Sequence, residues 1–190
     1  MLRIACILLT FTVASSVLAA PKTKNANEEF NRGLRLMKTI EAPLRAGKLK
    51  PEQMKTVQEV EAAYKSALEL APNHGRAHIS LGMLYRFTNR FGEAIPHLER
   101  GMTLKEGSAD WQIAAGTLTD VYFFQNKPQP AIPILEILIK YKPKDAQVHY
   151  QLGIANYYAG KPEPAKKALN QALAIDPSHA DAKKLLSAIN

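Results

Sequence analysis

The chain has 190 residues and a formal net charge of +8 at neutral pH, from 25 Lys and Arg against 17 Asp and Glu. Its single cysteine excludes a disulfide framework within the chain and a metal site built from several thiolates. The basic balance favours anionic partners without identifying one.

The first predicted element is a secretory signal peptide at residues 1–19. A short basic start precedes an uncharged apolar run at 4–18 and a small-residue exit. The run is shorter than the roughly 20 residues of a membrane-spanning helix. We expect cleavage after Ala19, because a cut after Ala20 would put Pro21 at the junction. Cleavage would remove Cys6 and Arg3, lower the net charge to +7, and leave a periplasmic or secreted protein without a transmembrane segment.

Residues 20–27 are polar, and we expect them to be disordered. A pair of helices is predicted between residues 28 and 74. The first, about residues 28–45, carries Phe30, Leu34, Met37 and Ile40 at helical spacing. The second begins at Pro51, and a basic loop at 45–50 joins the two.

One pattern then recurs, with a period of 34 residues wherever it is uninterrupted. Its small and apolar positions in the three copies are Leu81, Gly82, Ala94 and Leu98, then Leu118, Thr119, Ala131 and Leu135, then Leu152, Gly153, Ala165 and Leu169. In the last copy, two apolar stripes at helical spacing follow Asp145, a residue favoured at helix N-caps, and Gly160 separates them. Each unit is therefore a helix, a tight turn and a second helix. Gly153 and Ala165 are expected to be small because the paired helices approach closely near their turn.

The period and the pattern W-x-x-L-G-x-x-Y…A-x-x-x-F…P resemble the tetratricopeptide repeat. The chain departs from that pattern at the opening aromatic (His78, Ala115 and His149), at Thr119, at Asn156 in the tyrosine position, and at Glu106 in place of proline. The resemblance implies an all-α, right-handed superhelical solenoid of antiparallel helix pairs. We expect full repeats at 75–108, 112–145 and 146–179, a degenerate pair at 28–74 and a capping helix at 180–190.

Three extra residues interrupt the period between the first two full copies, in the stretch 105–111. We expect a longer loop there, with Asp110 as the N-cap of the next helix. Trp111, the only tryptophan, is expected to fill the resulting gap against Leu104 rather than to anchor a ligand.

The sequence contains no nucleophile elbow, phosphate-binding glycine loop or zinc-protease motif, so we expect neither enzymatic activity nor a cofactor. His74 and His78 are four residues apart, but a usable metal site needs three or four converging ligands. His97 and His179 are expected to be surface residues.

In proteins with this repeat, the first helix of each pair lines a concave groove that commonly holds a peptide. The resemblance therefore suggests groove residues in the three copies: Arg76, Ile79, Met83, Arg86, Asp120, Phe123, Gln147, Tyr150, Ile154 and Tyr157. The Lys, Arg and Asn clamp that grips a terminal carboxylate in the family's best-known mode is missing. Met83, Phe123, Tyr150 and Tyr157 are the expected exposed contacts, whereas a packing role is expected for Phe87, Phe124 and Tyr158.

The leading hypothesis is an exported scaffold or adaptor that binds a peptide or protein segment and helps to assemble an envelope or secretion complex. The alternative is a basic periplasmic protein that binds an anionic envelope surface or polymer, for which Lys48, Lys50 and Lys55 form the densest cluster. We expect no nucleic-acid partner, since no basic motif with interleaved aromatic residues occurs. Self-association through an open end of the solenoid is a third possibility.

Overall fold

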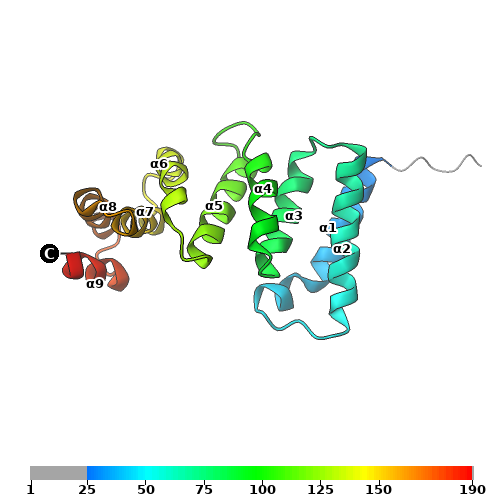
Figure 1. Cartoon of the computed structure of the whole chain (residues 1–190), viewed down its shortest axis with the longest axis horizontal. Helices are drawn as coiled ribbons and strands as arrows, with labels where there is room; N and C mark the ends of the chain where they lie inside the picture. Colours follow the sequence, from blue (N-terminus) through cyan, green and yellow to red (C-terminus); the bar gives the residue numbers. More distant parts are fainter. Residues whose placement is uncertain (1–24, 190) are drawn as a thin grey trace, which may run out of the picture.

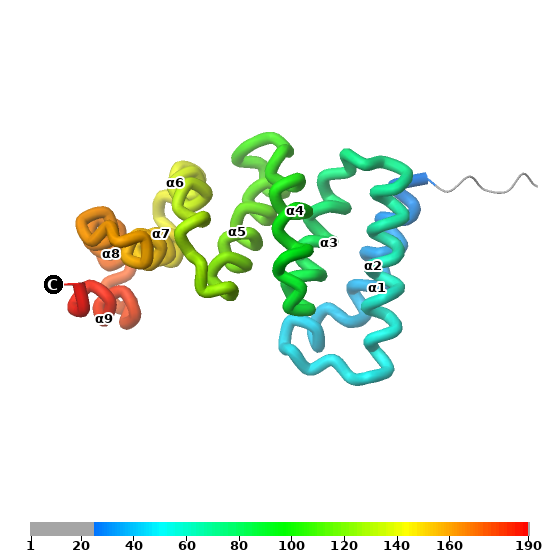
Figure 2. The backbone as a smooth tube through the Cα atoms, viewed as in Figure 1, coloured from blue at the N-terminus to red at the C-terminus, as the bar shows by residue number. Residues whose placement is uncertain are grey.

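A computed structural model describes residues 25–189, so the predicted signal peptide and most of the predicted disordered segment lie outside the described residues. Within this range the chain forms nine α-helices, one short 3-10 helix and no strand. The helices stack as successive antiparallel hairpins into an elongated solenoid (Figures 1 and 2). They are α1 (Ala26–Arg45), α2 (Gln53–Leu70), α3 (Gly75–Phe87), α4 (Phe91–Gly101), α5 (Ala109–Phe124), η1 (Gln129–Ala131), α6 (Ile132–Tyr141), α7 (Ala146–Tyr158), α8 (Pro162–Ile175) and α9 (Ala180–Ile189).

The first hairpin starts and ends at slightly different residues from those predicted. The side chain of Asn25 accepts a hydrogen bond from the backbone N–H of Glu28 at 2.8 Å, so α1 begins at Ala26 rather than at residue 28. The last two residues of the predicted disordered segment are therefore helical. The helix α2 begins at Gln53 instead of Pro51.

Small residues set the close approach of paired helices, as the sequence predicted for the last copy. A Cβ atom added to Gly153 would lie 2.7 Å from Leu169, and one added to Gly82 would lie 2.6 Å from Leu98. Both leucines are fully buried, so a larger residue at either glycine would push the helices apart.

The middle repeat lacks this device. Thr119 stands in the glycine position, is almost completely buried, and its hydroxyl has no hydrogen-bond partner among the described residues. The helix α6 touches α5 much less than α4 touches α3, and η1 is inserted between α5 and α6. The extra bulk of threonine is therefore accommodated by a looser pair.

The turn inside each hairpin relies on one residue in the left-handed region. That residue is Gly160 in the last repeat, with φ of 68°, as the sequence suggested. Asn89 and Asn126, with φ of 58° and 55°, take the same place in the first two. In each case the next residue donates its N–H to a carbonyl five positions earlier, for example Lys161 to Asn156 at 2.9 Å, which is the Schellman pattern.

The histidines stabilise turns between repeats. The Nε2 atoms of His78 and His149 lie 2.9 and 3.0 Å from the carbonyl oxygens of Pro72 and Pro143, six residues earlier in each case. This bond explains why histidine replaces the aromatic residue at the start of the motif.

Two histidines expected at the surface are instead partly buried. The Nδ1 atom of His179 accepts the backbone N–H of Ala182 at 3.3 Å, and so caps the start of α9. The Nδ1 atom of His97 lies 2.9 Å from Nδ1 of His78. The prediction of a surface role was therefore only partly right, because the His97 ring packs against His78 of α3 and the His179 ring packs against Tyr150 of α7.

The three-residue insertion changes how α5 begins. The N-cap is Ser108, whose Oγ accepts the N–H of Trp111, and not Asp110 as expected. Trp111 is only 3 % exposed, which confirms its space-filling role, and its ring lies next to that of Tyr141, with ring centres 5.9 Å apart. The hydroxyl of Tyr141 donates to Glu106 at 2.9 Å, so α6 holds the inserted loop in place.

Candidate functional site: the face of the first helices

The first helices of the three N-terminal pairs, α1, α3 and α5, form three adjoining hollows of about 250 to 370 Å³. Met83 on α3 lines all three, and Leu34 on α1 lines two of them. Met37, Arg45, Tyr64 and Ile113 are among the other lining residues. We call this region the N-terminal hollow. Its centre is apolar and its charged groups lie around it.

Two ion pairs cross from α3 to α5 at the edges of the N-terminal hollow. Arg76 pairs with Asp110 at 2.8 Å and Arg86 pairs with Asp120 at 2.9 Å, and both pairs join residues 34 positions apart. Burial raises the pKa of the Asp120 carboxyl, while Arg86 and Gln151 act in the opposite direction. Since each arginine already has a carboxylate, neither is a free clamp for a terminal carboxylate.

Arg86 also belongs to a cation–aromatic cluster at one end of this hollow. Its guanidinium lies 4.8 Å from the centre of the Phe87 ring and 5.0 Å from that of Phe124, and Arg45 lies 5.2 Å from Phe87. The Nε–H of Arg86 is buried without a partner in the described part of the chain. These stacked groups hold the arginine in one orientation.

A second hollow, of about 320 Å³, lies between α7 and α9, and we call it the C-terminal hollow. Its lining from α7 is Tyr150, Ile154, Tyr157 and Tyr158, and α9 adds Asp181, Lys184, Leu185 and Ala188. The Tyr150 ring is 4.6 Å from the His179 ring. Burial, followed by the charge of Asp181, raises the pKa of the Tyr150 hydroxyl.

The predicted groove residues divide between the two hollows. Arg76, Ile79, Met83, Arg86 and Asp120 line the N-terminal hollow, whereas Tyr150, Ile154 and Tyr157 line the C-terminal hollow. Phe123 and Gln147 line neither.

Burial differs among these residues. Ile79 is buried against the backbone of Gly101, so it forms the floor rather than an accessible contact. Phe123 is half-buried against the main core, and Gln147 is exposed.

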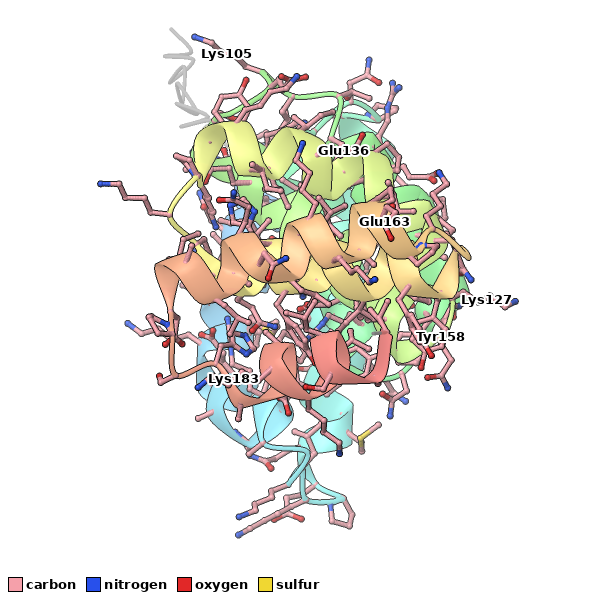
Figure 3. All side chains as sticks on the ribbon, turned by 90° about the vertical axis from the view of Figure 1, so that its left-hand side faces the viewer. Lys105, Lys127, Glu136, Tyr158, Glu163 and Lys183 are labelled. Carbon is pink, nitrogen blue, oxygen red and sulfur yellow. The ribbon has the colours of Figure 1, made fainter. Side chains whose placement is uncertain are left out.

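The expected packing role of Phe124 and Tyr158 was wrong. Their exposures are 58 % and 62 %, the highest of the large apolar side chains in the described range. Phe124 stacks on Phe91 with ring centres 5.9 Å apart and also contacts Arg86, yet more than half of its side chain is exposed. Tyr158 projects from the same edge of the solenoid as Lys127 (Figure 3).

The sequence interpretation also missed the contributions of the two terminal elements. Leu34, Met37 and Arg45 come from α1, while Asp181, Lys184 and Leu185 come from α9. The signal for α1 was available, because Leu34 and Met37 continue its apolar stripe although neither is buried. The helix α9 was predicted as a capping helix, but its part in lining a hollow was not.

Among residues 25–189, no three His, Cys, Asp or Glu side chains converge as a metal site would require. No helix in that range is both long enough and apolar enough to cross a membrane.

Comparisons with known proteins agree with this geometry. Two family models described as tetratricopeptide repeat match residues 75–107 and 122–189. No curated protein sequence matches the chain.

Several solved structures are similar. The crystal structure of MamA protein is 20 % identical, with a TM-score of 0.69 over 86 % of this chain and 81 % of that one. YrrB, a TPR protein, is 21 % identical, with a TM-score of 0.63 over 81 % of each chain. The first TPR of Spaghetti is 20 % identical, with a TM-score of 0.53 over 60 % of this chain and 89 % of that one. At these identities the likeness establishes the fold alone.

Proposed function

We propose that this chain, a tetratricopeptide-repeat protein, is a non-enzymatic scaffold that holds a peptide or protein segment against its first helices. One observation carries the proposal: the face of those helices is hollowed at both ends, and the hollows keep apolar and aromatic side chains partly exposed. Concave apolar surfaces with a few fixed polar groups are the usual form of binding sites, and aromatic residues and arginine are enriched at interface hot spots.

The chemistry of the hollows favours an apolar segment over an acidic tail. The solved YrrB structure is described as having an unusual peptide-binding site, and the Spaghetti domain is bound to the HSP90 peptide SRMEEVD. In this chain the positions of that clamp hold residues such as Ile79 and Met83, and Arg86 already forms an ion pair with Asp120. A terminal carboxylate would have to displace that partner, whereas an apolar side chain could bury area against Leu34 and Met83 directly.

A crosslinking pull-down with matched variants tests this proposal. Leu34 and Leu70 are exposed to similar extents, 42 % and 48 %, but only Leu34 lines a hollow. We expect the double variant Leu34→Ala, Tyr157→Ala to lose most of the partner captured by the unaltered chain, while Leu70→Ala retains it. Equal capture by all three proteins would contradict the proposal, provided that their helical circular dichroism is the same.

We further propose that the protein is exported and serves in the assembly of an envelope or secretion complex. The support is the leader-like composition of residues 1–19, with its basic start and apolar run. N-terminal sequencing of the protein from an exported fraction should give a chain that begins at Ala20. A protein that retains Met1 and stays inside the cell would contradict this assignment.

A second candidate function is attachment to an anionic envelope surface or polymer. It is favoured by three exposed lysines, Lys48, Lys50 and Lys55, which lie together in and just after the loop between α1 and α2. Exposed charges act through a screened potential, so such binding should collapse between about 0.05 and 0.5 M salt. Capture through the apolar hollows should survive the same change.

A further inference from the structure

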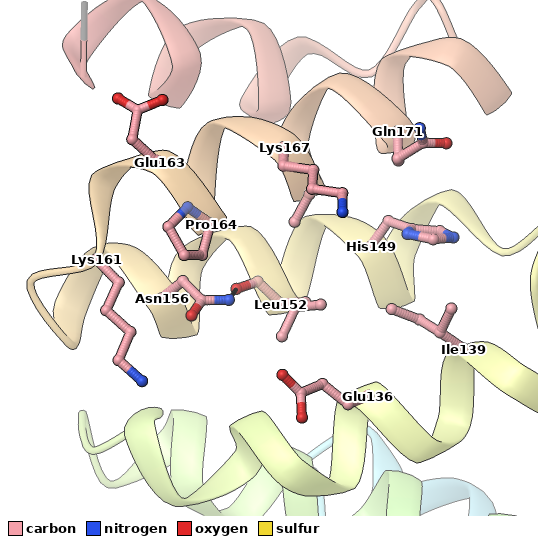
Figure 4. Close-up of a pocket in the computed structure, with 11 residues that line it drawn as sticks. Glu136, Ile139, His149, Leu152, Asn156, Lys161, Glu163, Pro164, Lys167 and Gln171 are labelled. Carbon is pink, nitrogen blue, oxygen red and sulfur yellow. Dashed lines mark hydrogen bonds between the residues drawn. The ribbon is translucent and has the colours of Figure 1, made fainter.

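A hollow larger than those described above lies between α6, α7 and α8, on the side formed by the second helices and apart from both of the others. Its volume is about 760 Å³, which is within the common range of ligand sites. Apolar atoms of Ile139, Leu152, Pro164 and Ala168 line it (Figure 4). Its charged lining residues are Glu136, Lys161, Glu163 and Lys167. We call it the α6–α8 cleft.

The two preceding repeats fill the corresponding space with a tyrosine. Tyr85 on α3 donates its hydroxyl to Glu61 on α2 at 3.1 Å, and the guanidinium of Arg90 lies 4.3 Å from the centre of its ring. Tyr122 on α5 engages Glu99 on α4, and burial followed by that carboxylate raises the pKa of its hydroxyl. In both repeats a phenol of the first helix therefore reaches a carboxylate of the preceding second helix.

The third repeat keeps the carboxylate but lacks the phenol. The position of Tyr85 and Tyr122 holds Asn156, whose amide donates to the Leu152 carbonyl of its own helix at 3.0 Å. Glu136 follows Leu135 as Glu99 follows Leu98, and its exposed side chain points into the cleft from α6 (Figure 4). The cleft therefore has the space, and at the position of Glu99 the hydrogen-bond acceptor, that Tyr122 uses one repeat earlier, whereas the acceptor of Tyr85 comes from one turn further back on α2.

We propose that the α6–α8 cleft binds a tyrosine side chain of a partner protein, with the ring against Leu152 and Ala168 and the hydroxyl donating to Glu136. A carboxylate is an acceptor only, so it matches a phenolic donor and repels a phosphorylated tyrosine. A purely apolar side chain would bury Glu136 without giving it a hydrogen bond, which is unfavourable.

Two lysines that line the cleft should favour acidic residues next to the bound tyrosine. Lys161 and Lys167 line the cleft, and no ion pair joins either of them to Glu136 or Glu163 in the described structure. Acidic residues beside the tyrosine would find opposite charges there. The occupant is thus a tyrosine in an acidic sequence context, and its site is independent of the hollows of the proposed function.

The test uses p-cresol, the side-chain analogue of tyrosine, followed by amide chemical shifts in NMR, with toluene as the probe that lacks the hydroxyl. Saturable shifts should concentrate on α6, α7 and α8, and p-cresol should bind about 10-fold more tightly than toluene because of the bond to a charged acceptor. Glu136→Leu should remove that preference. Leu34→Ala, which alters the N-terminal hollow, should leave p-cresol binding unchanged.

The variant Asn156→Tyr supplies the missing ring from the chain itself and should abolish the shifts without lowering the melting temperature. If it does not fold, Ala168→Leu narrows the cleft from α8 and should weaken p-cresol binding. Absence of saturable shifts, equal affinity for the two probes, or unchanged binding in a folded Asn156→Tyr protein would overturn the proposal. Self-association that Asn156→Tyr abolishes would place a second copy in the cleft and overturn the assignment to a separate partner.

Discussion

Replacing Glu61 by glutamine should remove a large, pH-dependent part of the stability of the N-terminal half. The Glu61 side chain on α2 is only 15 % exposed and reaches Tyr85 of α3 and Arg90, the residue just before α4. It accepts hydrogen bonds from Arg90 at 2.6 Å and Tyr85 at 3.1 Å, and it pairs with Lys65 at 2.7 Å. Burial by itself would raise the pKa of this carboxyl, but the bonds from Arg90, Lys65 and Tyr85 outweigh burial and lower the pKa to about 2.

The magnitude follows from linkage between protonation and folding. A carboxyl whose pKa falls from 4.5 to about 2 on folding contributes roughly 3 kcal/mol of stability when ionised. Because the folded pKa is depressed, this contribution is present above pH 4.5 and is lost as the pH falls toward 2. About 2 kcal/mol of it should be gone by pH 3.

The assay is urea unfolding followed by far-ultraviolet circular dichroism, because urea, unlike guanidinium, does not screen charges. The difference in free energy of unfolding between the unaltered chain and Glu61→Gln should be about 3 kcal/mol larger at pH 7 than at pH 2. Glu163→Gln is the control, since its carboxylate is 82 % exposed and 3.6 Å from Lys166, and its effect should be small at both values. A Glu61→Gln effect that does not change with pH would refute the reasoning.

Three further predictions concern the repeat core and its turns. Thr119→Ala should raise the free energy of unfolding by about 1 kcal/mol in urea melts, because it removes a buried hydroxyl that has no partner among the described residues. Thr117→Ala, whose exposed hydroxyl donates to the Ile113 carbonyl, should raise it by only the few tenths of a kcal/mol that helix propensity gives. Gly160→Ala should lower the free energy of unfolding by about 1 kcal/mol, because a Cβ is disfavoured at positive φ, and Asn126→Gly should raise it by a few tenths of a kcal/mol. Thermal melts in which both substitutions shift the melting temperature in the same direction would contradict the turn assignment. Burial, followed by the neighbouring His78 ring, lowers the pKa of His97. The free energy of unfolding should therefore decrease as the pH falls below 6.5, because the unfolded imidazole takes up a proton before the folded one does. If His97→Gln loses as much stability between pH 7.5 and 5.5 as the unaltered chain, His97 is not the source of the loss.

The architecture could be predicted because its determinants are local or repeat with a fixed period. Gly153 lies where the paired helices approach closely, as expected, next to Leu169 and the Ala165 carbonyl, and Gly160 forms the expected turn. Asparagine at 89 and 126 was not recognised as its equivalent, although asparagine is the residue that most often shares this conformation with glycine. The N-cap of α5 was misplaced because Ser108 and Asp110 are both good caps, and only the geometry of the inserted loop separates them.

The site was less predictable because exposure depends on what a neighbouring helix brings to the same place. Phe87, Phe124 and Tyr158 share one position in the repeat, yet Arg45 of α1 lies over the ring of Phe87, while Phe124 and Tyr158 are mostly open. No periodic rule predicts that difference, since the covering residue belongs to the degenerate repeat. The same holds for α9, whose Leu185 completes the C-terminal hollow.

Departures from the repeat pattern carry more information about this chain than the positions that conform to it. A threonine at a glycine position loosens one helix pair, and an asparagine at a tyrosine position leaves a cleft with its carboxylate still in place. From the sequence, both substitutions can be located but their outcomes cannot be predicted, because added bulk can be absorbed by moving the helices apart and lost bulk can be refilled by a neighbour or leave a space. The structure distinguishes the two cases: the looser pair around Thr119 closes over its hydroxyl, whereas the space beside Asn156 stays open to a ligand. The open space beside Glu136, lined by apolar atoms and by charged groups of both signs, is therefore the departure to test as a binding site.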